Sequence, residues 1–165
     1  MTETMWTELA EVPFSQGFLD AGGYRTRYLH AGDSSKPPLV LLHGVTGHAE
    51  AYARNLRSHG EHFDVWAIDL IGHGYSAKPE HPLEIRHYVR HVLGVLDAIG
   101  AQRAHLSGES LGGWVTARLA IEHPDRVDRI ALNTMGGTMA NPDVMRRLYE
   151  LSMEAARDPS WERVR

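Results

Sequence analysis

The chain has 165 residues, of which 42% are hydrophobic and 23% charged, a composition typical of one globular domain with a hydrophobic core. Its formal net charge of −4 comes from interleaved acidic and basic residues, which excludes a basic face for binding nucleic acid. No cysteine is present, so disulfides and thiolate chemistry are excluded and a reducing cytoplasmic location is expected.

The beginning of the chain does not have the pattern of a targeting segment. Residues 1–11 are acidic and lack an apolar core, so they do not form a signal peptide. The longest apolar run, residues 39–42, is too short to span a bilayer. We therefore expect no membrane partner.

Apolar runs along the first 132 residues predict strands separated by helical segments. Residues 15–20 and 24–30 flank a glycine pair and predict an antiparallel hairpin. Residues 39–42 are continuously apolar, which is typical of a strand buried on both faces of a parallel sheet. Further strands are expected at residues 63–69, 103–106 and 127–132. This order predicts an α/β fold with a mostly parallel sheet flanked by helices and an N-terminal antiparallel hairpin.

The helical segments have clear boundaries. Apolar residues at spacings of three and four predict a helix from about Leu83 to Ile99, with Pro82 in its first turn and Gly100 as a left-handed cap. A second helix is expected from Leu111 to about residue 123, ended by a proline. The predicted helices at 142–157 and from 159 onward are not followed by another strand. We thus divide the chain into a core, residues 1–134, and the start of a helical lid (cap), residues 135–165.

One serine stands where a strand becomes a helix. Residues 108–112 read GESLG and match the G-x-S-x-G pattern in the strand-to-helix context that this pattern requires. A sharp turn there holds the Ser110 hydroxyl clear of the backbone, and the free N–H groups of the new helix face any negative charge that develops beside it. We predict Ser110 as a nucleophile and the Leu111 amide as an oxyanion donor. The alternative is that Ser110 only caps the helix.

A glycine-bearing loop follows the buried strand at residues 39–42. Its sequence, HGVTG at residues 43–47, occupies the place where a second oxyanion donor is expected, and we assign the Val45 N–H to that role. The side chain of His43 is interpreted as a buried brace of the loop rather than a catalytic group. Gly44, Thr46, Glu109 and Trp114 are expected to contact the substrate.

Two other patterns in the sequence predict no catalytic role. The segment DLIGHGYS, residues 69–76, leaves a strand as a glycine-rich loop and is interpreted as structural, with a triad of Asp69, His73 and Ser110 as the alternative. The eleven histidines include pairs at helical spacing but no frame of metal ligands, so we expect no metal and no cofactor.

With these motifs assembled, the chain resembles the α/β-hydrolase superfamily. LLHGVTG, DLIGHGYSAKP and SGESLGGW occur in the expected order between about residues 18 and 133. Within the superfamily the chain looks most like hydrolases of meta-cleavage products, through the GGW that follows the nucleophile and through residues 52–55 after the oxyanion loop. The resemblance implies cleavage of a carbon–carbon bond in a 2-hydroxy-6-oxo-dienoate from aromatic degradation.

The sequence departs from that family pattern at two places. Many of those enzymes have Asn before the nucleophile, whereas this chain has Glu109, whose charge opposes an anionic substrate. The oxyanion loop also contains fewer glycines than theirs. A carboxylesterase or lactonase is therefore the alternative function, because acyl transfer uses the same serine and amides. A non-catalytic fragment that binds a small molecule is the second alternative.

The resemblance also implies an acid and a histidine for which this chain has no match. Both are expected after later strands, and the one histidine beyond Ser110 is His123, at the far end of the following helix. About a dozen residues at ~1.5 Å rise place it nearly 20 Å away, so it is not the base. We expect a small-molecule substrate and, as a partner, the missing C-terminal half in a second chain or segment, because a sheet of six strands leaves an apolar edge. Association into a homo-oligomer is a further alternative for the partner.

Overall fold

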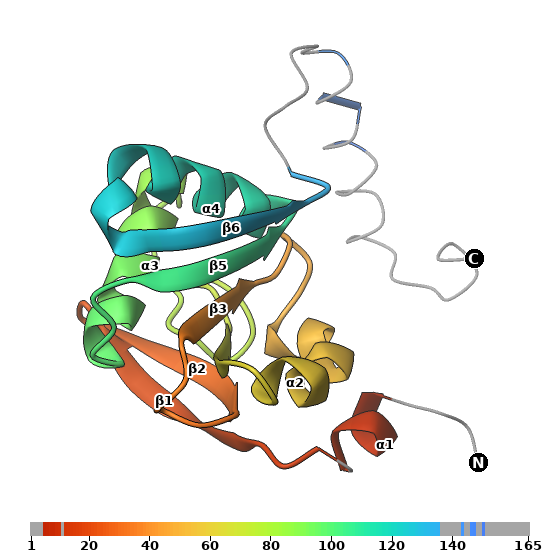
Figure 1. The fold of residues 1–165 in the computed structure, drawn as a ribbon. Helices are drawn as coiled ribbons and strands as arrows, with labels where there is room; N and C mark the ends of the chain where they lie inside the picture. The colour runs from red at the N-terminus through yellow and green to blue at the C-terminus, as the bar shows by residue number, and fades with distance from the viewer. Residues whose placement is uncertain (1–4, 11, 136–142, 144–145, 148–149, 151–165) are drawn as a thin grey trace.

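The structure, a computed structural model, describes residues 5–10, 12–135, 143, 146, 147 and 150. Six strands form one sheet that lies between two layers of helices (Figure 1). The strands are β1 (Ser15–Ala21), β2 (Tyr24–Ala31), β3 (Pro38–Leu42), β4 (Asp64–Ile68), β5 (Ala104–Glu109) and β6 (Val127–Asn133). The helices are α1 (Met5–Ala10), η1 (Ala49–Tyr52), α2 (Ala53–Gly60), α3 (Ile85–Ala98), α4 (Leu111–Glu122) and η2 (Pro124–Arg126).

The sheet has the order β1-β2-β4-β3-β5-β6. β1 and β2 form an antiparallel hairpin, and β2 pairs antiparallel with β4. All remaining pairs, β4 with β3, β3 with β5 and β5 with β6, are parallel. The predicted α/β fold, with a mostly parallel sheet and an N-terminal hairpin, is therefore confirmed.

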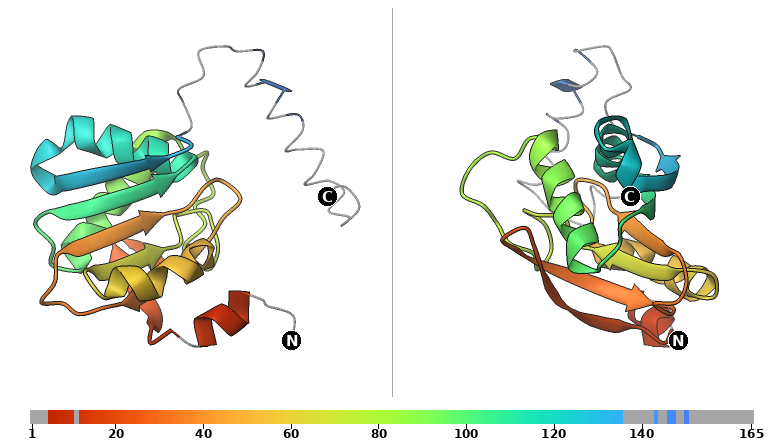
Figure 2. Two further views of the ribbon diagram at one scale, coloured as in Figure 1. Left: turned by 45° about the vertical axis from the view of Figure 1, so that its right-hand side comes forward. Right: turned by 60° about the vertical axis from the view of Figure 1, so that its left-hand side comes forward.

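The core lies on both faces of the sheet, as the apolar run at residues 39–42 predicts. Along β3, Val40 and Leu42 face a cluster that includes α3 and α4, whereas Leu39 and Leu41 face a cluster that includes α2. This alternation follows from the two-residue period of a strand. Figure 2 shows α3 and α4 together on one face of the sheet and α2 on the other. Each fully buried leucine contributes roughly 1.5–3 kcal/mol to folding.

The helix boundaries agree with the sequence at three ends of four. α4 spans the predicted range and stops before Pro124, and Gly100 has the left-handed φ of 71° expected after α3. α3 begins at Ile85 rather than Leu83, because Glu84 is its N-cap in a reciprocal capping box with His87. Pro82 therefore lies outside the helix. The expected lid, residues 135–165, falls outside the described residues apart from 135, 143, 146, 147 and 150.

The strand order places the candidate site. The chain runs from β3 to β4 on one side and then returns to β5 on the other side of β3, so the direction of strand addition reverses at β3. In open α/β sheets, ligands bind beyond the carboxyl ends of the strands at such a switch point. The loop after β3 and the turn after β5 therefore lie side by side.

β6 forms one edge of the sheet. Among its residues, Ile130 and Leu132 have 43% and 41% of their surface exposed. This agrees with the expectation of an apolar sheet edge on the described part of the chain. Among the described residues, no helix has both the length and the apolar character needed to cross a bilayer.

Candidate active site at the β5–α4 junction

Ser110 occupies a strained backbone conformation between β5 and α4. Its φ of 50° and ψ of −106° lie outside the regions that L-residues usually adopt. Such a residue costs of order 1–3 kcal/mol and is typical of functional sites. The Ser110 N–H donates to the Asn133 carbonyl at 3.0 Å, and its own carbonyl accepts from the Trp114 N–H at 3.0 Å. The turn is thus held by the neighbouring strand and by the new helix.

The side chain of Ser110 is not a capping group. Ser110 stands at the N-cap position of α4, but its hydroxyl makes no capping hydrogen bond. The residue is half-buried rather than turned into the core. The capping alternative therefore does not account for a serine at this position, and a strained turn with an uncommitted hydroxyl is what a nucleophile requires.

The glycines around Ser110 are required by close backbone approach. A Cβ at Gly108 would overlap the backbone of Gly112, and a Cβ at Gly112 would overlap the carbonyl of Leu42. The Gly112 N–H also donates to the His43 carbonyl at 3.2 Å. The start of α4 is thereby packed directly against the end of β3, which joins the Ser110 turn to the loop of residues 43–47.

Residues 43–47, the predicted oxyanion loop, form a tight turn whose Gly44 carbonyl accepts two hydrogen bonds. The donors are His43 Nδ1 at 2.7 Å and the Gly47 N–H at 2.9 Å. Because a trans peptide directs its N–H away from its carbonyl, these bonds also orient the Val45 N–H. Val45 and Thr46 are exposed, and Val45 has 60% of its surface accessible.

His43 braces this loop, as its interpretation from the sequence expected. Its Nε2 accepts the Leu70 N–H at 3.0 Å, so the ring proton lies on Nδ1 and is donated to Gly44. Burial lowers the pKa of His43 to about 4, against a smaller opposing effect of the hydrogen bond to Gly44. The ring is therefore neutral at physiological pH and keeps this tautomer.

A buried ionic cluster anchors the segment that follows the oxyanion loop. Arg27 on β2 donates to both carboxylate oxygens of Glu50, at 2.8 and 2.5 Å, and lies 3.6 Å from Asp69. Burial alone would raise the pKa of Glu50, but hydrogen bonds from Arg27 and His48 bring it to about 2. Asp69 also accepts the Ala49 N–H at 2.7 Å. These contacts hold η1 against β2 and the loop after β4.

The same contacts exclude the alternative triad. Asp69 is fully buried and is engaged by the backbone N–H groups of Ala49 and Tyr75 and by Arg27. The ring nitrogens of His73 face the carbonyls of Ile71 and Val45. Within the described part of the chain, the contacts of Asp69 and His73 therefore link neither residue to Ser110.

Glu109 places a carboxylate beside the oxyanion loop. A Cβ added to Gly44 would overlap the Glu109 carboxylate, so this acid lies against the Gly44 backbone. The pKa of the Tyr52 hydroxyl is raised by burial, and the negative charge of Glu109 nearby raises it further. The Tyr52 hydroxyl donates to the Leu42 carbonyl at 2.8 Å. The Glu109 carboxylate, which was predicted from the sequence to oppose an anionic substrate, thus lies next to Gly44.

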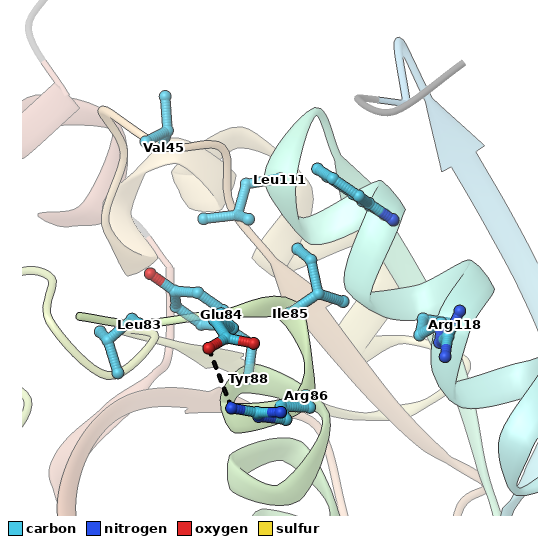
Figure 3. Close-up of a pocket in the computed structure, with 9 residues that line it drawn as sticks. Val45, Leu83, Glu84, Ile85, Arg86, Tyr88, Leu111 and Arg118 are labelled. Carbon is cyan, nitrogen blue, oxygen red and sulfur yellow. Dashed lines mark hydrogen bonds and ion pairs between the residues drawn. The ribbon is translucent and has the colours of Figure 1, made fainter. Parts of the chain in front are cut away.

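A cleft of about 710 Å³ opens between the N-terminal ends of α3 and α4. Val45 and Leu111, the two predicted oxyanion residues, form part of its wall, and Trp114 also lines it. Figure 3 shows Val45 and Leu111 above a floor that α3 provides. The remaining lining residues are Leu83, Glu84, Ile85, Arg86, Tyr88 and Arg118. This volume is within the range of small-molecule sites.

Some residues of the cleft were predicted from the sequence and others were not. Val45, Leu111 and Trp114 were expected at the site and line the cleft, whereas Gly44, Thr46 and Glu109 lie on or beside the oxyanion loop and do not line it. The α3 residues were missed, although α3 and α4 both begin at the edge where the parallel strands end. Among the described residues, no group of three or more His, Cys, Asp or Glu is placed to hold a metal ion.

Comparison with known proteins decides the family. A family model described as the alpha/beta hydrolase fold matches residues 37–162. The chain belongs to this family. The expected hydrolase activity agrees with its relatives, and the resemblance read from LLHGVTG, DLIGHGYSAKP and SGESLGGW is confirmed.

Three relatives show the range of hydrolases that the chain is similar to. A 2-hydroxymuconate semialdehyde hydrolase of Pseudomonas putida is 38% identical over 116 residues, which cover 68% of this chain and 40% of that protein. An uncharacterized carboxylesterase of Bacillus subtilis is 31% identical over 66% of this chain and 36% of its own length. The solved structure of a 2-hydroxy-6-oxo-6-phenylhexa-2,4-dienoate hydrolase from a Rhodococcus species superposes with a TM-score of 0.76 at 34% identity.

This chain spans only part of the proteins it matches. The superposition with the Rhodococcus enzyme includes 90% of this chain but 55% of that enzyme. The alignments with the two sequence relatives include 40% or less of those proteins. Its described residues carry the six strands, the turn at Ser110 and the loop of residues 43–47. The activities of these longer relatives are therefore not assigned to this chain.

Proposed function

We propose that this chain provides the nucleophile and the oxyanion hole of a serine hydrolase. The observation that carries the proposal is the backbone of Ser110, whose φ of 50° and ψ of −106° hold its uncommitted hydroxyl at the start of α4. The hydroxyl attacks a substrate carbonyl, and the negative charge that develops on the carbonyl oxygen is stabilised by the N–H groups of Leu111 and Val45. The positive end of the α4 dipole acts in the same direction.

The general base and its acid come, in this proposal, from outside residues 1–165. Ser110 needs a histidine to take its proton, and His123 caps the opposite end of α4. A second segment or chain that supplies the later strands would bring that histidine to the carboxyl edge of the sheet. The exposed Ile130 and Leu132 of the edge strand β6 support such a partner.

For the substrate we propose a meta-cleavage product, with hydrolysis of a carbon–carbon bond in a 2-hydroxy-6-oxo-dienoate. Support comes from the similarity to the hydrolases of Pseudomonas putida and Rhodococcus, at 38% and 34% identity. Gly44, Thr46, Glu109 and Trp114 are the proposed substrate contacts, and Trp114 lines the cleft beside the two oxyanion residues. The absence of cysteine supports a reducing cytoplasmic location.

Hydrolysis of a carboxylic ester or lactone is the second candidate. The position of Glu109 favours it, because a carboxylate against Gly44 repels an anionic dienoate but not a neutral ester. The similarity to the Bacillus subtilis carboxylesterase, at 31% identity, is also consistent with an ester substrate.

The nucleophile is tested by covalent labelling. We expect a fluorophosphonate to attach to Ser110 when the segment with the base is present, and Ser110→Ala to abolish attachment. Mass spectrometry of the labelled peptide identifies the residue. Ser107→Ala, in β5 of the same strand-turn-helix unit, is the matched control and should label normally. Labelling at another serine would overturn the assignment.

The substrate is tested by comparing a nitrophenyl ester with a ring-cleavage dienoate on the same preparation. Glu109→Asn removes the charge beside Gly44, and we expect it to raise kcat/KM for the dienoate while the neutral ester changes little. If the dienoate is not turned over by either form and the ester is, the carbon–carbon proposal fails and the ester alternative stands. If neither is turned over but a small acid binds, the chain acts as a binding fragment.

A further inference from the structure

The segment Gly72-His73-Gly74 has no role in the proposed chemistry, yet its backbone conformation requires glycine at two of its three positions. Both glycines have left-handed backbone conformations, with φ of 80° and 47°. A Cβ at Gly74 would overlap the Asp69 carboxylate, and one at Gly72 would approach Leu83 to 2.7 Å. Only glycine fits these two positions without strain. The tight turn that results brings the His73 ring to the oxyanion loop.

His73 is bonded to the backbone of an oxyanion residue. Its Nε2 lies 2.9 Å from the carbonyl oxygen of Val45, and its Nδ1 lies 3.0 Å from that of Ile71. A carbonyl oxygen only accepts and a neutral ring carries one N–H, so the ring donates to one of the two carbonyls; with the proton on Nε2, the nitrogen with the shorter contact, the bond is donated to Val45. The ring also packs edge-on against His43, with centroids 5.1 Å apart, and against Tyr88 at 6.2 Å.

Two histidines therefore hold the two peptide groups that flank the Val45 α-carbon. His43 and the Gly47 N–H hold the Gly44 carbonyl, and His73 holds the Val45 carbonyl. The Val45 N–H belongs to the first of these peptides, and rotation about Val45 is restrained by the second. Packing supplies little additional restraint, because 60% of the Val45 surface is exposed.

We propose that His73 is a positioning residue for the oxyanion hole, acting through its hydrogen bond to the Val45 carbonyl. This inference rests on the proposed role of the Val45 N–H as an oxyanion donor. Donors that are already oriented need no reorganisation when charge develops on the substrate. A loop that loses the His73 bond samples other orientations, so part of the stabilisation from the Val45 N–H is lost.

A pair of variants separates this role from a merely structural one. In His73→Gln the side-chain amide nitrogen reaches the place of Nε2 and still donates to Val45, whereas the shorter His73→Asn does not reach it. We expect the ¹⁵N order parameters of the Val45 and Thr46 amides to stay near ~0.85 in the wild type and in His73→Gln, and to fall below ~0.6 in His73→Asn. His81→Asn, at an exposed histidine bonded to Pro82, is the matched control and should change neither amide.

This relaxation measurement requires no turnover, so it judges the inference even if Ser110 is not labelled and the proposed function fails. In active enzyme we expect His73→Asn to lower kcat about tenfold, a fraction of the 10²–10³ lost when an oxyanion donor is removed. KM should change less than about twofold, because the donor acts on the transition state. His73→Gln should stay within about twofold of the wild type in kcat.

Equal order parameters in His73→Asn and the wild type, or equal losses of kcat in the Gln and Asn variants, would overturn the inference. If His73→Asn does not fold, His73→Ala titrated with free imidazole takes its place. Imidazole that occupies the vacated position should restore the order of the Val45 amide, and failure to do so also counts against the inference.

Discussion

Replacing Ser110, the proposed nucleophile, by glycine should make the protein more stable. Ser110 is held at φ 50° and ψ −106°, a conformation that costs of order 1–3 kcal/mol for a residue with a Cβ. Ser110→Gly removes this strain but adds roughly 0.5–1 kcal/mol of backbone entropy to the unfolded chain. The hydroxyl makes no capping bond, so little else is lost. The net expectation is a gain of about 1 kcal/mol, or a Tm higher by about 2–4 °C.

Two controls isolate the backbone from the side chain. Ser110→Ala keeps the Cβ and hence the strain, so its stability should stay within ~0.5 kcal/mol of the wild type. Ser107→Gly, in the middle of β5, gains the same flexibility without relieving a left-handed conformation and should lose roughly 0.5–1 kcal/mol. Urea unfolding followed by far-ultraviolet circular dichroism, with a common m value, measures all three differences.

The comparison of Ser110→Gly with Ser110→Ala decides the point. If the glycine variant is no more stable than the alanine variant, Ser110 is not strained in solution. The turn would then store no free energy for the presentation of a nucleophile. If the gain is found, the turn exemplifies the exchange of stability for function that active sites commonly show.

Three further predictions concern the packing around the site. Gly112→Ala drives a Cβ into the Leu42 carbonyl and should destabilise the protein by about 1–3 kcal/mol, measured by urea unfolding. Burial lowers the pKa of His91 to about 3 in the folded protein, against 6.5 in the unfolded chain. The free energy of unfolding should therefore fall as the pH drops from 6.5 towards 3. His91→Leu should reduce this pH dependence by about 1.4 kcal/mol per pH unit in urea unfolding titrations. Arg27→Met leaves the Glu50 carboxylate buried without its main partner and should lower the free energy of unfolding by about 3–5 kcal/mol. Adding Glu50→Gln should recover much of this loss. A double variant no more stable than Arg27→Met alone would show that the two residues are not coupled.

The order of elements and the sharp strand-to-helix turn at Ser110 could be predicted from the sequence because their signals are local. The apolar run at residues 39–42, the helical period of α3 and the GESLG turn each lie within a few neighbouring residues, and short-range sterics and burial suffice to specify them. The same holds for the glycines beside Ser110, which the pattern required before their close contacts were visible. The predicted start of α3 was wrong by two residues, because the N-cap bond between Glu84 and His87 competes with the preference of proline for a first turn.

What the sequence could not determine are the contacts between segments far apart in the chain. The bond from His73 to the Val45 carbonyl spans 28 positions, and the pair of Arg27 with Glu50 joins two elements separated by β3. The cleft between α3 and α4 exists only because both helices pack on one face of the sheet with their N-terminal ends at the same edge. Periodicity records which face of a residue's own element is buried, but not which distant element covers it. The partners of the oxyanion loop were therefore decided by the tertiary structure.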